Sequence, residues 1–242
     1  MKNRDGVYII KFNKKALLLC IIFLTLVVLG LKNPWKLSKV FNHENLKNIV
    51  IDPGHGGIDG GTGSASDILE KDINLDVALK LKKELLVENY NIIMTREKDQ
   101  SLEEFSNIKA SRYRRDLDAR KNIINENEPL VFVSIHVNAS TSPKARGIKI
   151  YHFPNSIEGE RLANNIKESI DEYVYGKFLK DENLKSEVLP EDYYILRETN
   201  FTGVLIEIGF ITNPEENKLL KDKKYKGKVA YAIKKGILEY LK

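Results

Sequence analysis

Four titratable side chains stand where they could take part in chemistry. His55 lies in a turn of proline and glycines directly after a short apolar run, and His136 ends another apolar run. Glu207 is embedded in a third apolar run, where an ionised carboxylate is costly without a partner, and Glu70 opens a stretch of helical periodicity. Two imidazoles and one carboxylate are a common ligand set for catalytic zinc, and a second carboxylate can act as general base. The residue types therefore indicate metal-assisted hydrolysis, but their scattered spacing assigns no individual roles.

Each histidine also has a structural interpretation. His55 could bond a backbone carbonyl of its own turn, and His136 could be a satisfied core histidine among apolar neighbours. His152 is a remaining candidate ligand, but it precedes a proline loop without an acidic neighbour. We therefore expect His152 to be exposed or close to a substrate, and we expect His43 to be a solvated linker residue.

The two glutamates have structural alternatives as well. Glu207 could form a buried ion pair with Arg96 or Arg197. Glu70 follows Asp67 at the spacing of a capping box, so its carboxylate could simply close the start of a helix. Three of the four chemically suggestive residues nevertheless converge on one edge of the predicted sheet, which favours one shared site.

The elements that would position these residues alternate between strands and helices. Helical apolar stripes occur at 70–86, 160–174 and 229–241, between short apolar runs typical of buried strands. These runs are 48–51, 91–95, 130–136, 147–153 and 203–210. We predict a single α/β domain with a twisted, mainly parallel sheet and helices on both faces. Sites in such folds lie at the carboxyl ends of the strands.

The charge distribution excludes one class of partner. The formal net charge is +5, but residues 1–31 carry +4 and residues 32–47 carry +3, which leaves −2 on residues 48–242. A slightly acidic folded part lacks the basic footprint of a nucleic-acid-binding protein. We therefore expect no nucleic-acid partner.

The N-terminus indicates export. Basic residues precede Ala16–Leu31, a charge-free and almost wholly apolar run that is slightly shorter than the roughly 17–25 residues of a membrane span. We predict a cytoplasmic basic stub and signal or membrane anchor at 1–31, more consistent with an uncleaved anchor than with a cleaved signal. A polar tether at 32–47 and a catalytic domain at 48–242 would follow, on the extracytoplasmic face of the membrane. The only cysteine, Cys20, lies inside the apolar run, which excludes cysteine catalysis and Cys-rich zinc sites in the exported part.

Five motifs together resemble a known family. "VIDPGHGGIDGG", "EKDINLDVALKLKKEL", "VFVSIHVNAS", "ARGIKIYHF" and "YYILRETNFTGVLIEIGFITNPEE" occur in order from about Asn48 to the end of the chain. They resemble the zinc-dependent N-acetylmuramoyl-L-alanine amidases (amidase type 3), which hydrolyse peptidoglycan. The resemblance implies one zinc ion per chain with ligands His55, Glu70 and His136, and Glu207 as the catalytic glutamate. It also implies a twisted α/β fold and, as in many relatives, a possible activator protein.

Within this family, the chain resembles the spore-cortex branch. It has no long insertion between His136 and Gly147, it shows no cell-wall-binding repeats, and the stretch 101–124 is rich in arginine. Enzymes of that branch strip the stem peptide from muramic acid so that muramic-δ-lactam can form. The resemblance implies a role in cortex maturation, in the space that surrounds the forespore.

The arginine-rich stretch predicts a helix that carries Arg112, Arg115 and Arg120. These side chains would contact core acids or an external anionic partner, or would form a solvated helix face.

Two alternatives to the amidase remain open. A membrane-tethered peptidoglycan-binding module would keep the fold and lose the metal, and a zinc peptidase would use the same residues on another bond.

Overall fold

The structure, a computed structural model, describes residues 14–32, 46–62 and 68–242. The chain divides into two compact units, Met1–Leu46 and Lys47–Lys242. His43, Asp67 and most of the predicted tether lie outside the described residues.

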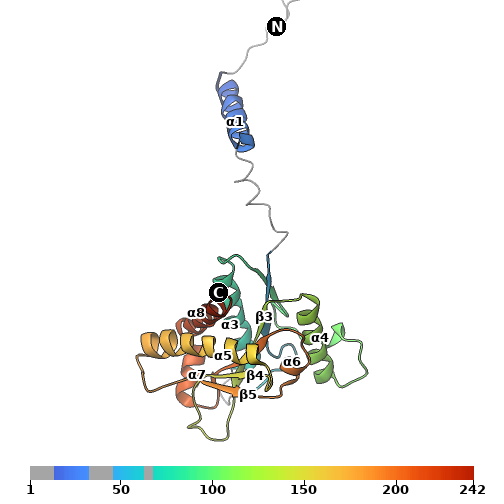
Figure 1. Cartoon of the computed structure of the whole chain (residues 1–242), viewed down its shortest axis with the longest axis vertical. Coiled ribbons are helices and arrows are strands. Elements are labelled where there is room, and N and C mark those ends of the chain that lie inside the picture. The colour runs from blue at the N-terminus through green and yellow to red at the C-terminus, as the bar shows by residue number, and fades with distance from the viewer. Residues whose placement is uncertain (1–13, 33–45, 63–67) are drawn as a thin grey trace, which may run out of the picture. The chain divides into compact units, whose positions relative to one another are not determined.

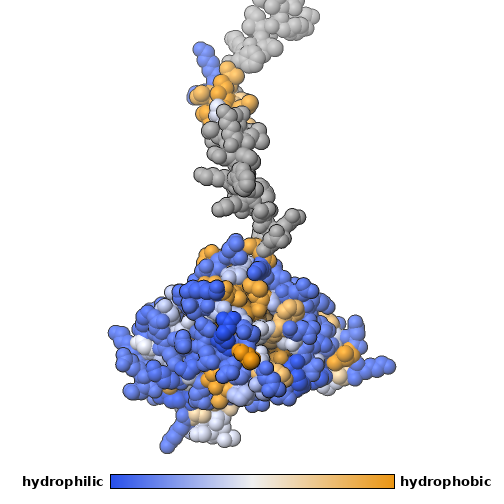
Figure 2. All heavy atoms as spheres, in the orientation of Figure 1, coloured by the Kyte–Doolittle hydropathy of each residue, from blue (hydrophilic) through white to orange (hydrophobic). Residues whose placement is uncertain are grey.

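The first unit contains one described helix, α1 (Lys14–Lys32). The coloured part of α1 is mostly hydrophobic, whereas the visible face of the second unit is mainly hydrophilic (Figure 2). Within the described ranges, no helix combines the length and the apolar character needed to cross a membrane.

The second unit is built on a six-stranded sheet with the order β2-β1-β3-β6-β4-β5 (Figure 1). The strands are β1 (Asn48–Pro53), β2 (Asn91–Met94), β3 (Val131–Asn138), β4 (Lys149–His152), β5 (Glu187–Pro190) and β6 (Gly203–Phe210). All neighbouring strands are parallel except β4 and β6, which pair antiparallel. The predicted α/β class is confirmed, but the sheet is mixed.

Helices cover both faces of this sheet. They are α3 (Glu70–Leu85), α4 (Arg112–Glu126), α5 (Ile157–Ile170), α6 (Tyr194–Arg197), α7 (Pro214–Lys221) and α8 (Lys223–Tyr240). Successive residues of a strand point to opposite faces: Ile49 and Ile51 join the large core beneath α3, α5 and α8, whereas Val50 packs in a smaller cluster with Ile124 of α4 and Ile195 of α6. Figure 1 shows α3 and α8 side by side, with α4 and α6 grouped apart from them.

Two differences from the predicted elements have simple causes. Strand β5 was not predicted, because it is short, because two of its four residues are exposed and because it ends in Pro190, as an edge strand can. The helix predicted at 160–174 is present, but it is an α-helix only as far as Ile170. It then continues as a π-helix, η2 (Asp171–Leu179). A short 3₁₀ helix, η1 (Glu103–Phe105), precedes α4.

Candidate active site

The sheet brings the predicted site residues to one edge. His55 follows β1, His136 lies near the end of β3, and Glu207 in β6 is the direct register partner of His136. Because β1, β3 and β6 are parallel neighbours, their carboxyl ends meet at the same place. Glu70 reaches this edge as the first residue of α3.

The bare turn around His55 has a steric cause. His55 itself adopts a left-handed backbone conformation with φ of 59°, which is uncommon for a residue with a side chain. A Cβ atom on Gly54 would lie 2.2 Å from His136 Cε1, and one on Gly61 would lie 2.5 Å from Glu70 Oε2. The glycines therefore leave the space that the candidate ligands fill.

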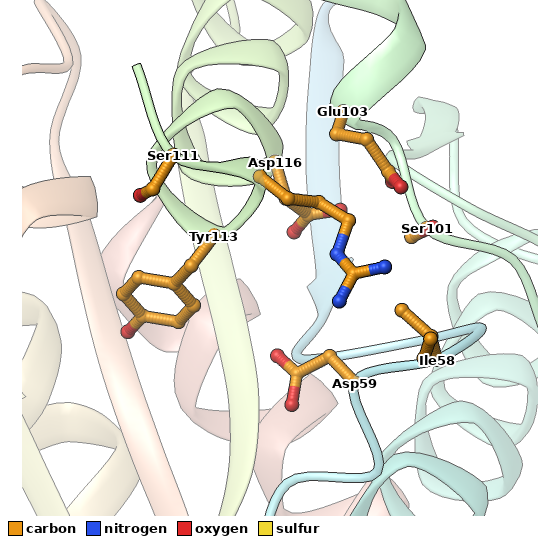
Figure 3. A pocket seen from close by; sticks show the side chains of 8 residues that line it. Ile58, Asp59, Ser101, Glu103, Ser111, Tyr113 and Asp116 are labelled. Atoms are coloured by element: carbon orange, nitrogen blue, oxygen red, sulfur yellow. The ribbon is translucent and has the colours of Figure 1, made fainter.

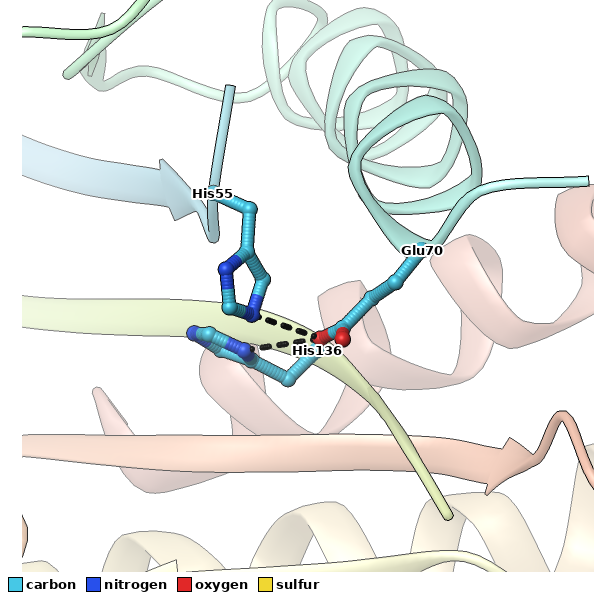
Figure 4. Close-up of side chains that lie close together, drawn as sticks. All are labelled: His55, Glu70 and His136. Atoms are coloured by element: carbon cyan, nitrogen blue, oxygen red, sulfur yellow. Dashed lines mark hydrogen bonds and ion pairs between the residues drawn. The ribbon is translucent and has the colours of Figure 1, made fainter. Parts of the chain in front are cut away.

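Three side chains point toward one another at this edge (Figure 4). Glu70 Oε1 lies 3.1 Å from His55 Nε2 and 3.0 Å from His136 Nδ1. The two imidazole rings meet edge to face with their centroids 5.0 Å apart. One nitrogen or oxygen atom from each of the three residues lies within 4.8 Å of the other two.

This spacing fits a metal ion. Zinc–nitrogen and zinc–oxygen bonds of about 2.0–2.1 Å in a tetrahedral site place neighbouring ligand atoms roughly 3.3 Å apart. The distances from Glu70 Oε1 to both imidazoles are already close to this value. Two nitrogens and one carboxylate oxygen also form an ordinary donor set for zinc.

Glu70 is held in its ionised form. Its carboxylate accepts hydrogen bonds from the backbone N–H groups of Thr62 (2.8 Å) and Val137 (3.1 Å). Burial alone would raise the pKa of Glu70, but hydrogen bonds and charge from His136 and His55 outweigh it and hold the pKa well below its usual range. A buried carboxylate that stays ionised is suited to binding a cation.

The capping-box alternative for Glu70 is wrong. Helix α3 begins at Glu70 itself, so Glu70 is not the third residue of the helix, and its N-cap is Leu69, whose side chain forms no capping hydrogen bond. The Glu70 carboxylate turns instead toward the two histidines.

His55 is oriented by a second carboxylate. Asp59 Oδ2 lies 2.7 Å from His55 Nδ1, so both ring nitrogens face carboxylate oxygens. Burial lowers the pKa of His55, but hydrogen bonds and charge from Glu70 and Asp59 outweigh it and raise this pKa to about 9. A carboxylate behind a histidine is the usual way in which proteins fix the orientation of a metal-binding imidazole. The sequence analysis missed Asp59, although its place four residues after His55 was visible.

Glu207 is in the opposite electrostatic state. Its Oε2 atom is buried and has no hydrogen-bond partner within the described part of the chain. Burial raises the pKa of Glu207 to about 7, with a further increase from the Glu70 charge and opposition from His136 and His55.

The ion-pair alternative for Glu207 is also wrong. Arg96 donates to backbone carbonyls, and Arg197 pairs with Asp192 and Glu198.

Two buried arginines hold the backbone of the His55 turn. Arg120 donates to the carbonyls of Pro53 (2.8 Å) and His55 (2.6 Å), and Arg96 donates to those of Pro53 (3.0 Å) and Gly54 (2.8 Å). These carbonyls accept hydrogen bonds from guanidinium groups instead of water, and the two arginines thereby fix the turn in place.

Arg120 also binds core acids, as one of the alternatives predicted. It pairs with Asp52 at 2.7 Å and with Asp116 at 2.6 Å. Arg112 and Arg115 lie on the same helix, as predicted, and Arg115 donates to the carbonyl of Ala110 at 2.7 Å.

The prediction for His152 is wrong. This side chain is 5% exposed, and its Nδ1 lies 3.0 Å from the carbonyl of Phe153. Strand β4 runs antiparallel to β6, with Lys149 opposite Glu207, so His152 is directed away from the edge that carries the candidate ligands.

A pocket of about 200 Å³ opens over this edge. Its lining includes His55, His136 and Glu207, together with tyrosines that the sequence analysis did not identify. These tyrosines are Tyr113, Tyr193 and Tyr194. They come from α4 and from the segment around α6, whose proximity to β6 depends on tertiary packing and leaves no local sequence signal.

Comparisons with known proteins agree with this geometry. Residues 49–239 match the family model for N-acetylmuramoyl-L-alanine amidase. The chain is 36% identical over 195 residues to the germination-specific N-acetylmuramoyl-L-alanine amidase of Bacillus subtilis (strain 168), covering 80% of this chain and 79% of that one.

Solved structures show the same likeness. One is the CwlD amidase from Clostridioides difficile in complex with the GerS lipoprotein, at 37% identity and a TM-score of 0.72, covering 81% of this chain and 98% of that one. Another is the catalytic domain of CwlV from Bacillus (Paenibacillus) polymyxa var. colistinus, at 29% identity and a TM-score of 0.69, with coverage of 81% and 98%. The chain therefore belongs to the N-acetylmuramoyl-L-alanine amidase family.

Proposed function

We propose that this chain is a zinc-dependent hydrolase that cleaves the amide bond between N-acetylmuramic acid and L-alanine in peptidoglycan. The observation that carries the proposal is the meeting of His55, Glu70 and His136 within 4.8 Å, beside a pocket that His55, His136 and Glu207 line. The Oε2 atom of Glu207 is buried there without a hydrogen-bond partner among the described residues. Family membership then indicates which bond such a site would hydrolyse.

In this proposal His55, Glu70 and His136 hold the metal. A zinc ion there would supply a Lewis acid that polarises the amide carbonyl and lowers the pKa of water toward about 7. Asp59 keeps the His55 imidazole oriented, and Arg96 and Arg120 keep its backbone turn in position.

Glu207 carries the proton. Its carboxylate takes a proton from the attacking water and returns it to the nitrogen of the departing L-alanine. A pKa of about 7 suits both steps, because such a group accepts and releases protons with equal ease near neutral pH.

We propose that the enzyme acts outside the cytoplasm in maturation of the spore cortex. Similarity to a germination-specific amidase supports this role. Residues 1–31 would serve as signal or anchor, 32–47 as tether and 48–242 as catalytic domain. The CwlD relative is in complex with the GerS lipoprotein, which supports a lipoprotein activator here as well.

Zinc content and zinc-dependent hydrolysis test this proposal. Purified chain should contain one zinc per molecule, lose peptidoglycan hydrolysis on chelation and regain it with added zinc. The His55→Ala/His136→Ala double variant should stay folded and bind no zinc. Full zinc content in the double variant would refute the assignment of the ligands.

A further inference from the structure

A second cavity adjoins the pocket of the candidate active site. It has a volume of about 460 Å³ and lies between the His55 turn, the segment before η1 and the start of α4 (Figure 3). Asp59, Tyr113 and Asp116 line both cavities, so the two are neighbours along one surface. Ile58 and Tyr113 are 69% and 62% exposed there, which gives the second cavity apolar contact surface as well as polar groups.

The acidic side chains that line this cavity are already engaged. Asp59 binds His55 and the backbone N–H of Gly61. Asp116 pairs with Arg120 and accepts from the N–H of Leu102 at 2.6 Å.

Glu103 offers little to a ligand either. It accepts a hydrogen bond from Ser101, and its remaining oxygen, Oε2, is buried away from solvent.

Arg112 differs from these acids. It is exposed, it is the one basic residue that lines the cavity in the described part of the chain, and it forms no hydrogen bond or ion pair with any described residue. The hydroxyl-bearing Ser101 and Ser111 line the cavity beside it. The charge of Arg112 helps, after the Ser101 hydrogen bond, to lower the pKa of Glu103, but no ion pair joins the two side chains. A guanidinium whose hydrogen-bond donors are unused by the described residues, among hydroxyl groups and next to the candidate active-site pocket, is suited to binding a carboxylate.

We propose that this cavity is the subsite for the stem peptide, and that Arg112 binds a carboxylate of that peptide. The inference rests on the proposed amidase function and adds the direction in which substrate lies. The two halves of the substrate differ in charge, because the stem peptide contains a glutamate and ends in a carboxylate, whereas the N-acetylated glycan is uncharged where its lactyl group is amide-linked. A cation beside the scissile bond therefore distinguishes the peptide from the glycan.

The adjacency of the two cavities suits this assignment, because Asp59, Tyr113 and Asp116 line both of them. An extended peptide advances about 3.3–3.6 Å per residue, so a stem peptide that leaves the first pocket would continue into the neighbouring cavity. Arg112 would then fix the stem peptide over the start of α4 and leave the glycan on the side of Tyr193 and Tyr194.

The test compares two substrates on the full-length, zinc-loaded protein. One is a synthetic muramoyl peptide with free carboxylates, and the other is the same compound with those carboxylates amidated. Arg112→Ala should lower kcat/KM for the free acid by about 10–100-fold, mainly through KM, because a hydrogen bond to a charged group is lost. The amidated compound should be cleaved equally by wild type and Arg112→Ala.

Two further variants sharpen the result. Arg112→Lys keeps the charge without the planar fork and should restore part of the loss. Arg146→Ala removes another exposed arginine, which among the described residues forms one long ion pair of 3.6 Å to Glu215, and the cleavage of both substrates should be unaffected. Circular dichroism and thermal unfolding matched to wild type would show that Arg112→Ala is folded.

The outcomes separate the two proposals. If wild type cleaves neither compound, the proposed function fails. If wild type cleaves both, and Arg112→Ala is unchanged or loses equally on both, the amidase stands and the peptide subsite is wrong.

Discussion

Glu70 and Glu207 border the same pair of histidines but are held in opposite states. Glu70 accepts hydrogen bonds from two imidazoles and two backbone N–H groups. Against the effect of burial, the two histidines keep its pKa low. Glu207 has a buried oxygen without a partner in the described residues, and its pKa is about 7. The surroundings thus divide the work between them, with one carboxylate suited to a cation and the other to a proton.

Glu207→Gln tests this division at the residue scale. The change preserves size and removes only proton transfer, so zinc content should stay near wild type while turnover on peptidoglycan falls by about 10²–10⁴. Glu70→Gln is the matched comparison, and it should weaken zinc binding itself. Near wild-type turnover in Glu207→Gln would show that this residue is not the base.

If His55 binds the proposed metal, binding should depend on pH. In the metal-free protein its pKa is raised from 6.5 to about 9, so at neutral pH a proton occupies the imidazole that the metal needs. Apparent zinc affinity should therefore rise about tenfold per pH unit between pH 7 and 9, as measured by competition with a chelator. An affinity that stays constant across this range would contradict a protonated His55.

The same shift has a defined sign for stability. Because the pKa of His55 is higher in the folded protein, its proton contributes stability that is complete below pH 6.5 and is lost as the pH rises through about 9. The metal-free protein should therefore become easier to unfold with urea between pH 6.5 and 9.5. A His55→Ala variant should not show that part of the decline.

At the scale of elements, α4 supports the β1 turn from one side. Arg120 joins Asp116 on its own helix to Asp52 in β1 and to the carbonyls of Pro53 and His55. Burial would raise the pKa of Asp52, but the Arg120 charge and hydrogen bonds from Ser134 and Thr95 lower it. The position of a candidate metal ligand thus depends on a helix far along the sequence.

Arg120→Met should remove the ion pair and the hydrogen bonds that join α4 to the turn after β1. Loss of one partner from a buried ion pair leaves Asp52 uncompensated, which costs about 3–5 kcal/mol of folding free energy. Urea unfolding should show this loss, and chelator competition should show weaker zinc binding. Arg115→Met on the same helix is the control, because within the described residues Arg115 donates one hydrogen bond, to the Ala110 carbonyl, and forms no ion pair, so its effect should be small on both measures. Equal effects of the two variants would contradict a specific role for Arg120.

Much of this arrangement could be predicted because its signals are local. The apolar runs that became β1, β3 and β6 are continuous in sequence, and the residues at their ends followed from the rule for parallel strands. The direction of β4 could not be predicted, because the sequence of a four-residue strand does not reveal which strand it pairs with. The antiparallel direction places His152 away from the site, whereas we expected it to be exposed or close to a substrate. The roles of Arg96 and Asp59 also depend on which backbone atoms and ring nitrogens face them, which spacing does not reveal.

At the scale of the whole molecule, the folded unit and the family match cover nearly the same residues. The unit Lys47–Lys242 holds the sheet, the candidate ligands and both cavities, and it coincides closely with the family match at 49–239. Its formal charge of −1 gives no general attraction to the anionic cell wall. Recognition of the substrate should therefore come from the site itself, through the proposed metal and the proposed roles of Glu207 and Arg112.

The most direct measurement is the mass of the products released from purified peptidoglycan by the zinc-loaded protein. Cleavage at the proposed bond yields peptides with a free N-terminal L-alanine and glycan strands whose muramic acids carry a free lactyl carboxylate. We predict these two products, and we predict that Glu207→Gln and chelator-treated protein release neither. Fragments cut within the peptide or between sugars, or no zinc-dependent release at all, would contradict an N-acetylmuramoyl-L-alanine amidase.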